Sequence, residues 1–523
     1  MTHQVRGDPS RLEAYTEATE PAVRASGVAV DDYDDAVDAF LTAGPNDLGT
    51  GGVLDRSPVV HLTLAALGRL DALPAAFAFA LRELDADGAV RVTTNLELFD
   101  ALVAARIASP NTKSGALVRQ VLADEFDELL ADPATTPADV RAFWDALTDE
   151  HQDDLVDEAP MLVGNADGVP PPVRYEANRL SIEREVDRLD EERAALVAEH
   201  DRLLRERAEA LDEIPGNDLL SQLPGADIGI DRWLDLTVGD PDDVTRQIAA
   251  LDGTAIALGK LLADDPRTGD QRQILVFDPR DDGRVAEVFG DLTGADNVAV
   301  LVPGTGTDLD NFTGGRDNEN AMGGVAARAD DLHAQMNDRA PDAENAVVAW
   351  LDWDAPDGVV TDATFDHYAD DAEADLLGLD GALAVEGVGA TTYIGHSYGS
   401  LVVGETTKAG LVADDLVFVG SPGVGGNSES ELGVDDGTTV WAARADGDPI
   451  AYGRDITDIF DPVLPGGDGE AELWFGRDPA EWAQRFTTAG SHGHDEYFLQ
   501  DSDALQNLAY IATQQDDLVT LVE

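Results

Sequence analysis

Residues Gly395 to Gly399 read Gly-His-Ser-Tyr-Gly, the spacing of a nucleophile elbow. In this pattern a serine projects from a tight turn, and a glycine two residues to either side lets a strand and a helix pass closely. The apolar residues 392–394 precede the turn and residues 401–403 follow it. The pattern predicts Ser397 as a nucleophile between the elbow glycines Gly395 and Gly399; the alternative is an ordinary glycine-rich turn.

A serine nucleophile needs a base and a group that orients the base. In folds that carry this elbow, an acid and then a histidine follow the serine along the chain. Asp448 in Gly-Asp-Pro-Ile is the preferred acid, with Asp446 as the alternate. The chain has 9 histidines, and two lie in one loop near its C-terminal end. We expect His494 to be the base, since an imidazole titrates near neutral pH, and His492 is the alternate.

An oxyanion hole is expected where the apolar run 297–302 enters Pro-Gly-Thr-Gly-Thr. Backbone N–H groups around Gly304, Thr305 and Gly306, together with that of Tyr398, would hold the developing charge. A phosphate-binding loop is the alternative, but the lysine and spacing of such loops are missing. The acids near residues 308–320 do not have the spacing of a calcium loop. We therefore expect neither a metal nor a cofactor.

From about residue 270 onward, β-branched runs alternate with helix-like stretches, which is typical of a parallel sheet with crossover helices. Asp281-Asp282-Gly283 indicates a hairpin between the first two strands. An antiparallel pair followed by parallel strands is therefore predicted. The expected strands are 274–278, 285–289, 298–302, 346–351, 392–395, 416–420 and 440–443.

Residues 1 to about 225 are expected to be helical, with the strongest pattern over 176–212. There Ile182 begins a row of apolar residues at every seventh position, but charged residues interrupt the companion row. This single stripe predicts a long helix packed on another helix of the same chain. A partner protein or an oligomer is the alternative. Glycines and prolines in 213–240 predict a linker, followed by a helix over 242–264.

These patterns divide the chain into three predicted parts. Residues 1–135 form an N-terminal helical region, residues 136–225 a helical domain with the long helix, and residues 226–523 the sheet-containing domain.

The composition narrows the classes of function. With 34 basic and 105 acidic residues, the formal charge is −71, which disfavours nucleic-acid binding. The absence of cysteine excludes disulfides and thiol catalysis. No apolar run is long enough for a transmembrane helix. The first residues show no ordinary signal peptide, so a cytoplasmic location is expected by default, with leaderless export as the alternative.

Several motifs resemble the actinobacterial α/β-hydrolase family of uncharacterised function, and the resemblance covers about residues 136 to 515. The motifs are residues 301–307, 395–400 and 420–425, His494-x-x-Tyr497-Phe498, and upstream residues 160–170 and 176–180. Residues 7–12 also resemble the start of the small WXG-type helical proteins that type VII secretion exports.

The resemblance implies an α/β-hydrolase fold, preceded here by an all-α region, and a serine-hydrolase triad carried onto Ser397, Asp448 and His494. The predicted reaction is transfer of an acyl group from a small-molecule ester to water. The alternative is a catalytically silent protein that uses the hydrolase fold for interaction, linked to a type VII secretion or toxin system.

Overall fold

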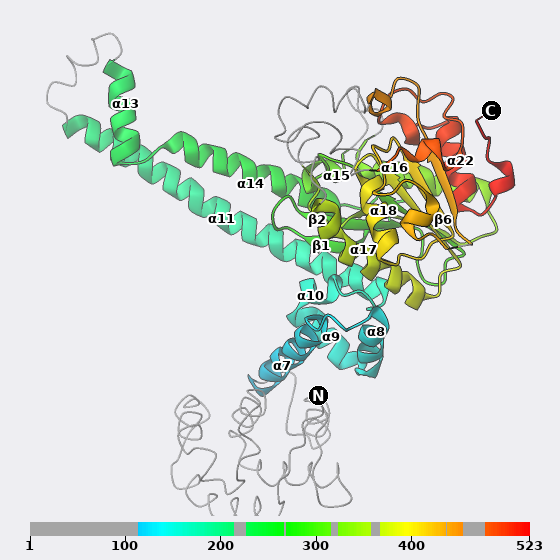
Figure 1. Ribbon diagram of the computed structural model, residues 1–523. Coiled ribbons are helices and arrows are strands. Elements are labelled where there is room, and N and C mark those ends of the chain that lie inside the picture. The colour runs from blue at the N-terminus through cyan, green and yellow to red at the C-terminus, as the bar shows by residue number, and fades with distance from the viewer. Residues whose placement is uncertain are drawn as a thin grey trace, which may run out of the picture. The chain divides into compact units, whose positions relative to one another are not determined.

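The computed structural model describes residues 113–213, 226–265, 268–314, 323–356, 367–435, 437–452 and 476–522 (Figure 1). Most of the predicted N-terminal region, including the WXG-like residues 7–12, lies outside these ranges. Within them, no helix has the length and apolar character that crossing a membrane would need.

The described chain falls into two compact units. The first contains the helices α7 (Lys113–Leu130) and α9 (Asp149–Glu158), which contact each other. Their interface buries Phe126 and Leu155, and Arg119 forms ion pairs with two acids of α9. The helix α8 (Pro137–Ala146) begins in the second unit, which contains residues 136–143 and the described residues from 160 onward.

The second unit contains an eight-stranded sheet with the order β1-β2-β4-β3-β5-β6-β7-β8. The strands β1, β2 and β4 pair antiparallel, and every other neighbouring pair is parallel. All seven predicted strands and the predicted hairpin are therefore confirmed, while the very short β8 was missed. The bounds are β1 (Gln273–Asp278), β2 (Arg284–Phe289), β3 (Asn297–Val302), β4 (Asn345–Leu351), β5 (Ala390–His396), β6 (Asp415–Val419), β7 (Thr439–Ala443) and β8 (Gln484–Arg485).

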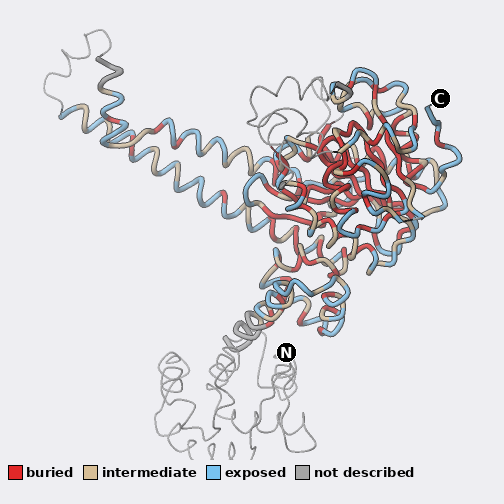
Figure 2. Tube along the Cα trace, in the orientation of Figure 1, coloured by how far each residue is buried: buried red, intermediate tan, exposed pale blue. Residues whose placement is uncertain are grey.

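Helices cover both faces of the sheet, so β3, β4 and β6 are buried along their whole length. The helix α16 (Val325–Arg339) crosses from β3 to β4 and contacts α22 (Asp503–Ala512). The helices α17 (His367–Glu386) and α18 (Gly399–Ala409) cross in the opposite direction and contact each other. Right-handed crossovers in opposite directions place helices on opposite faces. Figure 2 shows the resulting buried core in red.

The order of the strands places the candidate chemistry at one edge of the sheet. The chain leaves β3 in one direction, toward β4, and later continues from β5 in the other direction. The crevice at the carboxyl ends of β3 and β5 is thus the switch point at which such sheets bind ligands. The glycine-rich loop follows β3, and Ser397 follows β5.

Short helices and turns complete the unit in the loops between the longer elements. They are α15 (Leu309–Phe312), α19 (Glu429–Leu432) and the 3-10 turns η1 (Pro449–Tyr452), η2 (Pro479–Glu481), η3 (Glu496–Phe498) and η4 (Asp516–Leu518).

The long helix is α11 (Pro171–Glu213), and it packs against α14 (Pro241–Leu262) and β1. Its predicted stripe is buried at Ile182, Leu189 and Leu203, so packing on a helix of the same chain is confirmed. Figure 1 shows α11 and α14 side by side, leading away from the sheet.

The predicted linker over residues 213–240 is wrong in part, because it contains the helix α13 (Ala226–Thr237). A proline and a glycine precede this helix and Gly239 follows it, so the residues that indicated a linker stand at its two ends.

The strand β1 lies at one end of the sheet, and residues 160–178 cover its outer edge. This segment begins with the short helix α10 (Pro160–Gly164). The amide of Asn165 donates to the carbonyl oxygen of Phe277 at 2.8 Å and accepts from the N–H of Phe277 at 2.9 Å. Asn178 donates to the carbonyl oxygen of Ile274 at 3.1 Å. These side chains take the place of a neighbouring strand, because an uncovered edge would leave backbone groups unpaired.

We expect Asn165→Ala to lower the free energy of unfolding by about 2 kcal/mol, since the substitution removes two hydrogen bonds to partly buried backbone groups. Urea denaturation measures the loss, and hydrogen exchange at the Phe277 amide reports its position. The matched control is Asn427→Ala, whose side-chain hydrogen bonds are exposed and whose loss should be smaller. Equal losses in the two variants would contradict the edge-covering role.

Candidate functional site

Ser397 occupies the turn between β5 and α18 with a φ of 56°, in the left-handed region. This conformation costs a residue other than glycine about 1–3 kcal/mol and is typical of functional turns. The N–H of Ser397 donates to the carbonyl oxygen of Val419 at 3.1 Å. The turn is therefore tied to the end of the neighbouring strand β6.

Both elbow glycines stand where a side chain would not fit. A Cβ atom at Gly395 would lie 2.6 Å from the Cα of Ser400. One at Gly399 would lie 2.3 Å from the carbonyl oxygen of Val302, at the end of β3. The close passage of strand, turn and helix that the spacing predicted is therefore present.

The structure brings Asp448 and His494 together from two loops. The imidazole Nδ1 donates to the carboxylate, with distances of 3.0 Å to Oδ1 and 3.2 Å to Oδ2. The carboxylate is fully buried, and Tyr497 Oη donates to its Oδ2 at 2.5 Å. The N–H of Ile450 donates to Oδ1 at 2.9 Å.

These contacts decide the charge of the acid. Burial by itself raises the pKa of Asp448, but the hydrogen bonds from His494, Tyr497 and the Ile450 N–H outweigh burial and hold the pKa below its usual value. The carboxylate is therefore ionised at neutral pH. It keeps the Nδ1 proton of His494 in place and leaves Nε2 facing away from the acid.

The two alternates from the sequence lie on the surface. Asp446 and His492 are both exposed, and they meet through a backbone bridge instead of through their side chains. The N–H of His492 donates to a carboxylate oxygen of Glu496 at 2.8 Å. Neither alternate lines the pocket that contains Ser397.

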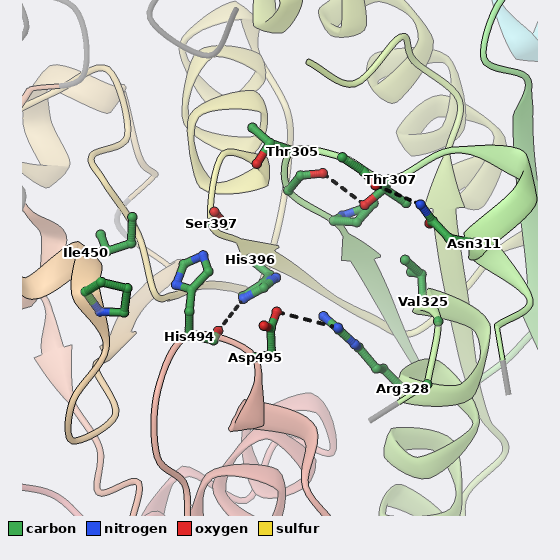
Figure 3. Close-up of a pocket in the computed structure, with 16 residues that line it drawn as sticks. Thr305, Thr307, Asn311, Val325, Arg328, His396, Ser397, Ile450, His494 and Asp495 are labelled. Atoms are coloured by element: carbon green, nitrogen blue, oxygen red, sulfur yellow. Dashed lines mark hydrogen bonds and ion pairs between the residues drawn. The ribbon is translucent and has the colours of Figure 1, made fainter. Parts of the chain in front are cut away.

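Ser397 and His494 line one pocket of about 440 Å³ at the carboxyl ends of the strands. Figure 3 shows the imidazole of His494 pointing toward the Ser397 hydroxyl, with Thr305 on the other side of the serine. The residues that line the pocket come from the loop after β3, the start of α16, the elbow, and the loops that hold Asp448 and His494.

The glycine-rich loop after β3 packs directly on the serine. A Cβ atom at Gly304 would lie 2.6 Å from the Cβ of Ser397, so only glycine allows this approach. Thr305 and Gly306 also line the pocket. The N–H of Gly306 donates to the carbonyl oxygen of Pro356 at 2.8 Å and is therefore already used within the fold. The ring of Tyr398 stacks on Trp353 with 5.8 Å between ring centroids.

Sequence reasoning missed the role of His396, the residue before the serine. Its Nε2 donates to the backbone carbonyl oxygen of His494 at 2.8 Å, and the two rings lie 4.9 Å apart. Burial, with help from the nearby His494 and Arg328, lowers the pKa of His396 to about 3. This imidazole is therefore neutral, and its hydrogen bond fixes the backbone of the loop at His494.

Sequence reasoning also assigned no role to Gly420 or Tyr497, although both belong to motifs that the chain shares with the actinobacterial α/β-hydrolase family. A Cβ atom at Gly420 would lie 3.0 Å from Asp448 Oδ2 and 3.1 Å from two ring atoms of His494. Tyr497 Oη accepts from the N–H of Ala445 at 3.0 Å while it donates to Asp448. Within the described ranges, no cluster of three or more acids and histidines could hold a metal ion.

Known proteins resemble this chain over parts of different length. An α/β-hydrolase family matches residues 278–457. An uncharacterised protein of Mycobacterium tuberculosis is 27% identical over 412 residues, which is 74% of this chain and 57% of the relative. An uncharacterised protein of Mycobacterium bovis is 34% identical over 196 residues, which is 35% of this chain and 69% of the relative.

The match thus spans little more than half the length of the first of these relatives. Among solved structures, one titled as an arylesterase has a TM-score of 0.28 and 13% identity, with 56% of this chain and 98% of that chain covered. The predicted α/β-hydrolase fold is confirmed by the family match and by the order and direction of the strands.

The buried His396 gives a test of the site's construction. His396→Gln keeps an N–H donor for the carbonyl oxygen of His494, whereas His396→Leu removes it. We expect His396→Leu to be the less stable variant above neutral pH by about 1–2 kcal/mol, because it leaves a buried carbonyl oxygen unpaired. Urea denaturation of the two variants measures the difference, and equal stability would contradict the assigned contact.

The same residue predicts a pH dependence. The unfolded chain binds a proton at His396 below its ordinary pKa of 6.5, but the folded protein binds it only near 3. The free energy of unfolding therefore has its full contribution from the neutral His396 above pH 6.5. This contribution declines as the pH falls toward 3. Below pH 6.5, the wild type should lose about 1 kcal/mol more per pH unit than His396→Gln. Parallel curves of unfolding free energy against pH would contradict the low pKa.

Proposed function

Since the chain belongs to the α/β-hydrolase family of uncharacterised mycobacterial proteins, we propose that it is a serine hydrolase that transfers the acyl group of an ester to water. Ser397 is the nucleophile, His494 the general base and acid, and Asp448 the residue that orients the imidazole. The observation that carries the proposal is the left-handed Ser397 in the same pocket as His494, whose imidazole is hydrogen-bonded to the buried Asp448.

In the first half of the reaction, Ser397 Oγ bonds to the ester carbonyl carbon while its proton moves to His494 Nε2. The carbonyl oxygen becomes an oxyanion held by N–H groups of Tyr398 and the Gly304–Thr305 segment. When the intermediate collapses, the bond to the leaving alkoxide breaks and His494 returns the proton to that oxygen. An acyl-enzyme remains on Ser397.

In the second half, a water molecule attacks the acyl carbon and gives a proton to His494. The bond between the acyl carbon and Ser397 Oγ breaks, and the serine takes the proton back. The buried Asp448 stabilises the imidazolium in both halves, because its ionised carboxylate faces the Nδ1 proton. No metal or cofactor takes part in these steps.

The alternative is a protein that uses the hydrolase fold only for interaction. Fold alone does not decide between the two, because hydrolase folds host proteins without activity. A reactive serine is what distinguishes them, so covalent labelling separates the proposals without knowledge of the substrate.

We expect a fluorophosphonate probe to label the full chain at one serine and Ser397→Ala to abolish the label. Ser400→Ala and Ser421→Ala are matched controls, since both serines lie beside the site and donate to backbone oxygens in structural roles. Labelling and peptide mass spectrometry make the measurement. A wild-type protein that stays unlabelled, or a label that survives Ser397→Ala, would contradict the proposal.

Gly420 gives a second test that does not alter the triad itself. We expect Gly420→Ala to reduce kcat/KM for 4-nitrophenyl hexanoate by about tenfold or more, because the added methyl group displaces Asp448 or His494. Gly433→Ala is the control: its φ of 72° imposes a similar backbone cost, but no atom lies within 4 Å of the added carbon. Equal loss of activity in both variants would show that backbone strain alone accounts for the effect.

A further inference from the structure

The pocket beside Ser397 contains a cation that the proposed reaction does not use. Arg328 lies in the first turns of α16 and lines the same pocket as Ser397, His396 and His494. Figure 3 shows its guanidinium reaching toward the centre of the pocket, across from the serine. Among the described residues that line this pocket, Arg328 is the one arginine, and lysine is absent.

The charge of Arg328 is only partly neutralised. Its ion-pair partner is Asp495, at 3.6 Å. The Asp495 side chain is 66% exposed, whereas that of Arg328 is 15% exposed. Water therefore weakens the carboxylate's hold on the guanidinium. The Nε atom of Arg328 is buried and has no hydrogen-bond partner among the residues that the structure describes.

The groups around the guanidinium provide no second negative charge among the described lining residues. His396 is neutral, and none of the other polar lining side chains is an acid apart from Asp495: they are Thr305, Thr307, Asn311, Ser397 and His494. Burial lowers the pKa of Arg328, and the neighbouring Asp495 acts in the other direction. A guanidinium keeps its charge in proteins. A charged, poorly solvated guanidinium therefore faces the space that a substrate would occupy.

The start of α16 adds to this field. Gly323, Gly324 and Val325 line the pocket, and the N-cap residue Gly324 has no side chain to cap the first turn. The positive end of the helix dipole thus faces the same space as Arg328. The dipole supports the arginine here but would not define a site alone.

We propose that the substrate carries an anionic group, a carboxylate or a phosphate, that binds Arg328 while the ester carbonyl lies at Ser397. The inference rests on the proposed serine-hydrolase function and adds its substrate class. Arginine suits this task because its planar fork donates two hydrogen bonds to two oxygens of one anion. The anion would compete with the exposed carboxylate of Asp495 for the guanidinium.

The test compares anionic esters with neutral esters of similar size. On the acyl side the pair is mono-4-nitrophenyl adipate and 4-nitrophenyl hexanoate. On the alcohol side it is 4-carboxyphenyl acetate and 4-carbamoylphenyl acetate. At one fixed ionic strength, we expect the wild type to prefer the anionic member of at least one pair in kcat/KM.

Arg328→Met should reduce that preference by about tenfold to a hundredfold, mainly through KM, and Arg328→Lys should restore part of it. Asp495→Asn should increase the preference, because it removes the carboxylate that competes for the guanidinium. Arg477→Met is the control: it removes the same charge from a surface ion pair with Glu481, so the preference should stay unchanged. A wild-type preference that survives Arg328→Met would overturn the proposal, as would no preference in either pair.

A measurement without catalysis separates this inference from the proposed function. Adipate should raise the Tm of the full-length protein more than adipamide does, and Arg328→Met should remove the difference. If the fluorophosphonate labels Ser397 but neither the ester preference nor the Tm difference depends on Arg328, the substrate class is wrong and the hydrolase proposal stands. If labelling fails but the Tm difference depends on Arg328, the hydrolase proposal is wrong and the anion site stands.

Inorganic phosphate in the same assay distinguishes a phosphate group from a carboxylate.

Discussion

The buried carboxylate of Asp448 is the constraint on which the arrangement of the site depends. It accepts hydrogen bonds from His494, Tyr497 and the N–H of Ile450, and it has no contact with solvent. An ionised carboxylate in such a place is stable only while its donors stay in position. The loop after β7 and the loop before α22 are therefore held together by one charge, and the orientation of the His494 ring follows from that.

The serine is positioned by a different set of contacts, made of close backbone approaches. Gly395 and Gly399 let β5, the turn and α18 pass one another, and Gly304 lets the loop after β3 approach Ser397. His396 joins the two sets, because it belongs to the elbow and donates to the carbonyl oxygen of His494. A neutral buried imidazole suits this purpose, since a charged one would repel the imidazolium that forms on His494 during the proposed reaction.

Much of the fold could be predicted from local patterns in the sequence. The β-branched runs and the Asp281-Asp282-Gly283 turn predicted every strand except β8, which has only two residues and therefore shows no periodicity. The prolines and glycines around α13 led to the prediction of a linker in place of a short helix, because these residues occur at helix ends as well as in linkers.

The residues of the candidate site could be inferred only where a residue type combines with a fixed spacing. Ser397 has such a spacing, but the choice between Asp446 and Asp448, or between His492 and His494, depends on which side of a loop faces the protein. Arg328 carries no local signal, because it reaches the pocket from a helix whose sequence reads as an ordinary amphipathic segment. Contacts between distant parts of the chain decide both cases.

The acidic composition and the cation in the pocket act at different distances. A formal charge of −71 repels anions approaching the molecule, but mobile ions screen that repulsion beyond about 10 Å at moderate salt. A substrate anion in the pocket would lie within a few ångströms of Arg328, well inside that screening distance, so salt weakens its attraction to Arg328 less. A strongly acidic surface is therefore compatible with selection of an anionic substrate. As the salt concentration increases, the long-range repulsion weakens more than the attraction between Arg328 and the substrate.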